Sequence, residues 1–176
     1  MTAFGEKLNG TGFRFIRRSA DSQPGTYDIR VTSARSRANV TGSLVAEDLT
    51  VNETIDITLT RDAVPTNITV NLLSGDTVAT QLQKLNDEFT TNSHDLTAYL
   101  DADGKINIRS TEFGADYSVD VQSDQVAGPG TSGIGNVQIS DTGTDLAGFI
   151  GGSPARVIDG NRLKGDTGFS TEDIEV

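Results

Sequence analysis

A glycine-rich segment is the clearest match in this sequence to a ligand-binding motif. Residues 128–133 (GPGTSG) fit the pattern G-x-G-x-x-G of dinucleotide-binding loops. That chemistry requires the loop to open a helix, because the helix N-terminus holds the pyrophosphate. Here a proline lies inside the loop, and residues 137–139 (VQI) alternate as in a strand. The segment therefore predicts a Gly-Ser-Asp linker over residues 123–136 and no nucleotide site.

A second candidate is the run Asp101-Ala102-Asp103-Gly104, which is similar to the start of a calcium-binding loop. Glu112 stands at the twelfth position, where such a loop has its bidentate ligand. The sixth position, however, is Ile106 where a glycine is needed, and Ile106 and Ile108 alternate as in a strand. We expect a hairpin turn here and no metal.

No set of residues for catalysis can be assembled. His94 is the only histidine and there is no cysteine, which excludes thiol catalysis, thiolate metal sites and disulfides. No G-x-S-x-G elbow is present. Acidic pairs are common in a chain of net charge −11, so no glycosidase dyad can be selected. We expect a protein that is not an enzyme and has no cofactor.

The composition of the chain argues against further classes of function. The net charge of −11 argues against binding to nucleic acid or to anionic membranes. No run of about 18 apolar residues predicts a transmembrane helix, and residues 1–12 lack a signal-peptide pattern. The chain then stays inside the cell, leaves it without a cleaved signal, or is a fragment of a longer protein.

The charge is distributed unevenly along the chain. Residues 1–37 hold seven basic and three acidic side chains, a net charge of +4, so the rest carries −15 within the total of −11. The arginines either pair with acidic groups of their own chain or contact the acidic face of the next subunit. For the second alternative, the candidate contact residues are Arg14, Arg17, Arg18, Arg35 and Arg37, facing acids such as Asp116, Asp120, Asp124 and Glu172.

The elements that would position these groups are clearest in the middle of the chain. Residues 54–60 and 66–72 alternate apolar and polar side chains, and five residues between them predict a hairpin.

A helix is predicted next, over about residues 76–90. One stripe of this helix carries Val78, Leu82, Leu85 and Phe89, and the residues that face away are Gln81, Lys84, Asp87 and Glu88. We expect this stripe to pack on the sheet face of Ile55, Ile57, Leu59, Ile68 and Val70. Alternation around 96–100, 106–108 and 117–121 completes a β-β-α-β-β-β module.

The flanking regions carry shorter strand patterns. Residues 26–32 predict a strand with residues 38–45 as its partner, and strands are expected at 137–139, 146–150 and 156–158. The acidic end, residues 170–176, is expected to fray. The predicted domains are an N-terminal segment with a strand pair (1–52), the module (53–122) and a smaller Gly-rich β unit (123–176). In an alternative division of the chain into domains, residues 123–176 pack with residues 1–52 as one domain. The predicted fold class is α+β, mainly antiparallel sheet with one principal helix.

Three segments resemble flagellar proteins. Residues 24–32 (PGTYDIRVT) are similar to a strand of flagellar hook-associated protein 2, the filament cap. Residues 55–121 resemble a repeat of flagellins and cap proteins, with DTV at 76–78, LN at 85–86, DADG at 101–104 and GADYSV at 114–119. Residues 143–152 (GTDLAGFIGG) and 160–165 (GNRLKG) resemble tail segments of the same proteins.

The resemblance covers about residues 24–170 and implies a structural role. It implies the surface-exposed domains of a filament cap protein, cut from a longer chain whose terminal helices are absent here. Its partners would be copies of itself in a ring or filament, flagellin and host surface molecules, and its location extracellular. The alternatives are the variable outer domain of a flagellin and an adhesin-like module that binds glycan or protein.

Overall fold

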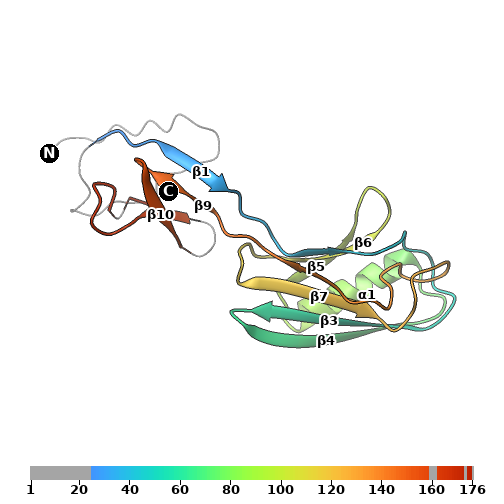
Figure 1. Ribbon diagram of the computed structural model, residues 1–176. Helices are drawn as coiled ribbons and strands as arrows, with labels where there is room; N and C mark the ends of the chain where they lie inside the picture. Colours follow the sequence, from blue (N-terminus) through green and yellow to red (C-terminus); the bar gives the residue numbers. More distant parts are fainter. Residues whose placement is uncertain (1–24, 159–161, 173, 176) are drawn as a thin grey trace. The chain divides into compact units, whose positions relative to one another are not determined.

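The chain folds into two compact units, and the larger is inserted in the smaller. A computed structural model describes residues 25–158, 162–172 and 174–175 (Figure 1). Residues 1–36 and 144–176 make up the smaller unit, and residues 37–143 make up the larger one. Three of the candidate contact residues, Arg14, Arg17 and Arg18, lie outside the described residues.

The larger unit contains one helix and seven strands. They are β2 (Asn39–Thr41), β3 (Glu53–Arg61), β4 (Val64–Leu72), α1 (Val78–Thr91), β5 (Leu96–Leu100), β6 (Ile106–Ser110), β7 (Tyr117–Ser123) and β8 (Ile139–Thr142). The order from β3 to β7 is the predicted β-β-α-β-β-β. The unit extends beyond residues 53–122 at both ends, because β2 and β8 each add a strand to its sheets. The α+β class with mainly antiparallel sheet is confirmed.

Two sheets enclose the core of this unit. One has the order β4-β3-β7-β8 and the other β2-β6-β5. Helix α1 contacts the edge strands β4 and β5, while β2 contacts β8 at the opposite edges. Figure 1 shows β3, β4 and β7 side by side with α1 close to them. The helix therefore closes one open side of the two-sheet core.

The predicted stripe of α1 packs in this core. Leu85 and Phe89 are buried and Val78 and Leu82 half-buried, in one cluster with the inward residues of β3 and β4. Thr77 is the N-cap, and its hydroxyl accepts from the backbone N–H of Thr80. The prediction that Gln81 faces away is wrong. It is fully buried, and its Nε2 donates to the carbonyl of Glu47, 2.7 Å away, which offsets part of the cost of burying the amide.

The hairpin of β3 and β4 is tighter than predicted. Arg61 pairs with Val64, so the turn has two residues and not five. Asp62 and Ala63 have φ of 51° and 62°, as in a type I′ turn, whose twist matches that of the strands it joins. The turn draws Pro65, which the sequence placed in the loop, into strand β4.

The predicted pairing of residues 26–32 with 38–45 is also wrong. β1 (Ile29–Ser33) pairs with β9 (Ala147–Ile150), and β2 pairs with β6 in the other unit. Val40 of β2 is buried in the larger unit. The local alternation identified both strands, but their partners lie far away in the sequence.

The described residues of the smaller unit form a four-stranded antiparallel sheet. Its order is β1-β9-β10-β11, with β10 at Ser153–Ile158 and β11 at Arg162–Gly165. Ile150, Leu163 and Ile174 form its core. The expected fraying of the C-terminal residues is wrong for those that the structure describes. Thr171, Ile174 and Glu175 are buried, and the Glu175 carboxylate pairs with Arg162.

Candidate interaction surface

The glycine motif lies in a buried loop and not in a linker. Residues 130–135 are all buried in the larger unit. The carbonyls of Gly130, Thr131 and Gly133 accept hydrogen bonds of 2.9–3.0 Å from the backbone of residues 44–50. A Cβ on Gly133 would lie 2.3 Å from the carbonyl oxygen of Leu44, so only glycine allows this approach. The linker prediction is corrected: the small residues let two loops pack backbone to backbone.

A buried carboxylate, that of Glu53, holds this loop. Glu53 is 2% exposed. Its Oε1 accepts from the hydroxyls of Ser123 and Ser132 at 2.6 Å, and its Oε2 accepts from the N–H of Ser132 at 2.8 Å. The Glu47 carboxylate accepts from the N–H of Gly130 at 2.9 Å. Two N–H groups that could face a phosphate thus bind carboxylates of the same chain, and β8 follows the loop instead of a helix.

The Asp101 carboxylate organises the turn between β5 and β6. Its Oδ1 accepts from the backbone N–H groups of Asp103 and Lys105 at 2.9 Å, and its Oδ2 from the Asn107 amide at 3.2 Å. The Lys105 N–H in particular lowers the pKa of this carboxyl. Across the described residues, no three potential ligands among His, Asp and Glu gather as a metal site would require.

The candidate contact arginines within the described residues belong to different units. Arg35 is exposed in the smaller unit. Arg37 is half-buried in the larger unit, with its guanidinium 4.2 Å from the centre of the Phe113 ring. Arg37 is therefore partly engaged in its own fold, and the subunit contact stays a prediction.

His94 is half-buried. It lines a small hollow of about 110 Å³ together with Arg61 and Asp95. Arg61 Nη1 and Asp95 Oδ2 form an ion pair of 2.9 Å. Thr66 and Ser93 also line this hollow, but its one carboxylate, that of Asp95, is already paired with Arg61.

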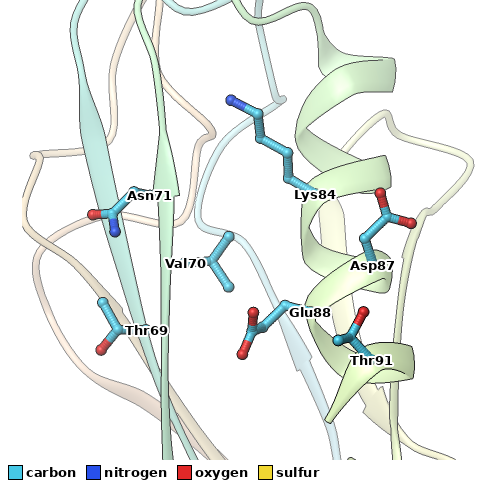
Figure 2. Close-up of a pocket in the computed structure, with 7 residues that line it drawn as sticks. All are labelled: Thr69, Val70, Asn71, Lys84, Asp87, Glu88 and Thr91. Atoms are coloured by element: carbon cyan, nitrogen blue, oxygen red, sulfur yellow. The ribbon is translucent and has the colours of Figure 1, made fainter.

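A larger groove lies between strand β4 and helix α1, with a volume of about 340 Å³. Three consecutive residues of β4 line one side, and one face of α1 lines the other. The lining residues are Thr69, Val70, Asn71, Lys84, Asp87, Glu88 and Thr91. Figure 2 shows Val70 directed toward the helix and the Lys84 and Glu88 side chains extending toward the strand. We call this feature the β4–α1 groove.

The electrostatics of the groove are acidic. Lys84 is its one cation, and its ammonium lies 2.6 Å from Asp76 Oδ2. The backbone N–H of Leu73, and then the Lys84 ammonium, hold the pKa of Asp76 below its usual range. The Glu88 carboxylate accepts from the Asn92 amide at 2.7 Å, and Asp87 is exposed. Asp76, Asp87 and Glu88 against Lys84 leave a net charge of −2 at this groove.

The outer face of the β4-β3-β7-β8 sheet is polar. Facing pairs across β3 and β4 are joined by side-chain hydrogen bonds of 2.8–3.3 Å: Thr54 with Asn71, Thr58 with Asn67, and Thr69 with Asp56. Such pairs stabilise the strands and fix their register. The outer face is therefore ordered but offers no apolar patch along these two strands.

The two units differ in charge. Residues 37–143 contain five Lys and Arg and 16 Asp and Glu, a net charge of −11. The residues of the smaller unit contain nine of each and are neutral. The whole net charge of the chain therefore resides on the larger unit.

Sequence reasoning missed the β4–α1 groove. It assigned Lys84, Asp87 and Glu88 to the solvent side of the helix, but it had no means to place β4 beside them. One signal was available: a proline within a strand marks an edge strand, and Pro65 stands in β4. It could have shown that β4 has a free edge.

The fold defines a class of two antiparallel β units, one inserted within the other, with a single helix in the inserted unit. No protein-family model matches the sequence, and no curated protein is similar to it in sequence. Among the described residues, no helix is long and apolar enough to span a membrane.

Solved structures of this class do match. The D2-D3 domains of the flagellar cap protein FliD from Escherichia coli align with a TM-score of 0.60 at 14% identity, over 95% of this chain and 88% of that chain. Those from Serratia marcescens align at 0.56 and 16% identity, over 92% and 97%. FliD (HAP2) from Pseudomonas aeruginosa PAO1 aligns at 0.53 and 16% identity, over 88% and 74%.

The chain therefore has the fold of the D2-D3 domains of flagellar cap proteins, as its sequence resemblance implied. It spans 51% of the longer Escherichia coli D1-D2-D3 chain. At identities of 14–17% the likeness establishes the fold.

Proposed function

We propose that this chain forms the surface-exposed domains of a bacterial filament cap protein, which supports flagellin assembly at the filament tip. The role is structural and not catalytic. The observation that carries the proposal is the shared two-unit fold, which covers 92–95% of this chain and 88–97% of the solved D2-D3 domains. The three resembling sequence segments, spread over residues 24–165, support it independently.

The partners that follow are copies of the same protein and flagellin. A ring uses heterologous contacts, in which one patch meets a different patch of the next subunit. A chain with a neutral unit and a unit of charge −11 offers two such unlike surfaces. The basic contact would involve Arg14, Arg17, Arg18, Arg35 and Arg37 of one subunit, and host surface molecules are a further class of partner.

The protein would act outside the cell, exported without a cleaved signal peptide as part of a longer chain. Export of an unfolded chain through a narrow channel is compatible with the absence of cysteine, since no stray disulfide can form outside.

Deletion of the gene in the source bacterium tests the proposal. If the chain belongs to a cap, flagellin should still be made but should appear in the medium as monomer, and motility should fall. Normal filaments with reduced attachment would instead indicate an adhesin. Loss of the flagellin itself would indicate the outer domain of a flagellin. Quantitative immunoblots of filament and medium fractions distinguish the three outcomes.

A further inference from the structure

Strand β4 exposes a hydrogen-bonding edge toward the β4–α1 groove. In an antiparallel hairpin with a two-residue turn, the residues that flank the turn exchange backbone hydrogen bonds, and the pattern then alternates. Arg61 and Val64 flank the turn, and Thr60 faces Pro65 in the next pair. The backbone groups of residues 65, 67, 69 and 71 therefore point away from β3.

The proline agrees with this assignment. Pro65 lacks an N–H, and the position it occupies is one whose N–H would face outward, so the β3–β4 ladder stays complete. Farther along the edge the N–H groups are present. Within the described part of the chain, no protein group accepts from the N–H of Thr69 or Asn71. The edge is thus blocked at one end and open over residues 67–71.

The α1 side of the groove favours a partner with basic side chains. Lys84, Asp87, Glu88 and Thr91 are spaced so that they share one helix face. The one cation is already paired with Asp76, whereas Asp87 has no partner among the described residues. A basic side chain entering the groove would meet a net negative wall on a unit of charge −11.

We propose that the β4–α1 groove binds an extended segment of a partner polypeptide as an added strand along β4. The backbone of the segment pairs with the free groups of Asn67, Thr69 and Asn71. Its side chains alternate between two surroundings. Those on the α1 side lie beside Val70, where lysine or arginine pairs with Glu88 and Asp87. Those on the other side lie beside Thr69 and Asn71, where threonine, serine or valine fits. This inference does not depend on the flagellar role.

The test is a titration of the isotope-labelled protein, followed by amide NMR, with an acetylated and amidated peptide Thr-Lys-Thr-Val-Thr-Lys-Thr. Shifts should centre on the amides of Asn67, Thr69 and Asn71 and on the facing turns of α1. The same peptide with N-methyl groups on alternate backbone nitrogens should bind at least about fivefold more weakly, because it cannot pair with the edge.

Protein variants test backbone pairing and charge pairing separately. Thr69→Pro removes an outward N–H in the way that Pro65 does, and should weaken binding at least about fivefold. Asp87→Lys should weaken binding about two- to fivefold. Asp103→Lys, the same charge change in the exposed β5–β6 turn, should leave binding unchanged. Equal affinity for the N-methylated peptide, shifts outside the groove, or equal effects of Asp87→Lys and Asp103→Lys would overturn the proposal.

Discussion

Single carboxylates determine much of the local order in the larger unit. Glu53 connects the start of β3 to Ser123 at the end of β7 and to Ser132 in the buried loop. The groups that donate hydrogen bonds to this buried carboxylate are all neutral. Burial of a polar group costs free energy unless its hydrogen bonds are made. The sequence predicted a strand from residue 54, directly after this acid, but it does not show that two distant serines face the carboxylate.

Glu53→Gln should therefore destabilise the protein by about 1–3 kcal/mol, because the amide N–H₂ would face the N–H of Ser132. Hydrogen exchange of the amides of residues 130–135 should accelerate. Glu47→Gln is the matched control, since Glu47 is an exposed acceptor to the same loop, and it should cost less than about 0.5 kcal/mol. An equal loss of stability in both variants would show that the burial of Glu53 does not add to the effect of its substitution.

Asp76 should contribute stability that depends on pH. Its pKa is lowered in the folded state by the Leu73 N–H and by Lys84, so its contribution is present above the unfolded pKa of about 3.9 and is lost as the pH falls through the folded value. The difference in melting temperature between the native protein and Asp76→Asn should be largest at about pH 5–7 and should shrink below about pH 4. A difference that stays constant down to about pH 3 would contradict this assignment.

At the scale of elements, the spacing of apolar residues correctly predicted those strands and that helix whose buried face sets this spacing. The alternation of Ile55, Ile57 and Leu59 and the helical spacing of Leu85 and Phe89 identify a half-buried strand and a helix, and these elements pack as expected. The pairing of β1 with β9 was not predictable, because it joins segments more than a hundred residues apart. The prediction of a linker from the glycines was wrong for a physical reason. The Thr50 side chain lies against Gly130 and the backbone of Leu44 lies against Gly133, so neither position has room for a side chain. A mobile linker would have the same composition.

The β3–β4 hairpin contains a strained position that can be improved. Ala63 has a φ of 62°, a left-handed conformation that costs a residue with a Cβ about 1–2 kcal/mol. Ala63→Gly should relieve this strain and stabilise the protein by about 0.5–1 kcal/mol after the entropic cost of glycine. Ala79→Gly, the same chemical change on the exposed side of α1, should destabilise it by about 0.5–1 kcal/mol. Thermal unfolding of both variants checks the opposite signs.

At the scale of the whole molecule, the distribution of charge should govern association. Two larger units repel each other at −11 each, so a favourable contact must join a basic region to an acidic one. Exposed ion pairs contribute only about 0–1 kcal/mol each. The chain should therefore be monomeric or weakly associated at about 150 mM salt, and any oligomer should dissociate as salt rises.

Light scattering at about 20 mM and about 500 mM salt measures this effect. Arg35→Gln should weaken any association seen at low salt, since Arg35 is exposed in the neutral unit. A stable oligomer that is insensitive to salt would mean an apolar interface and would exclude the arginines as its main contact.

The proposed function places these domains in a cap at the filament tip. Immunogold electron microscopy of intact cells, with antibodies raised against the folded chain, tests it most directly. Gold particles should appear at the distal ends of filaments and not along their length. Particles distributed along the filament, or over the cell body, would contradict it.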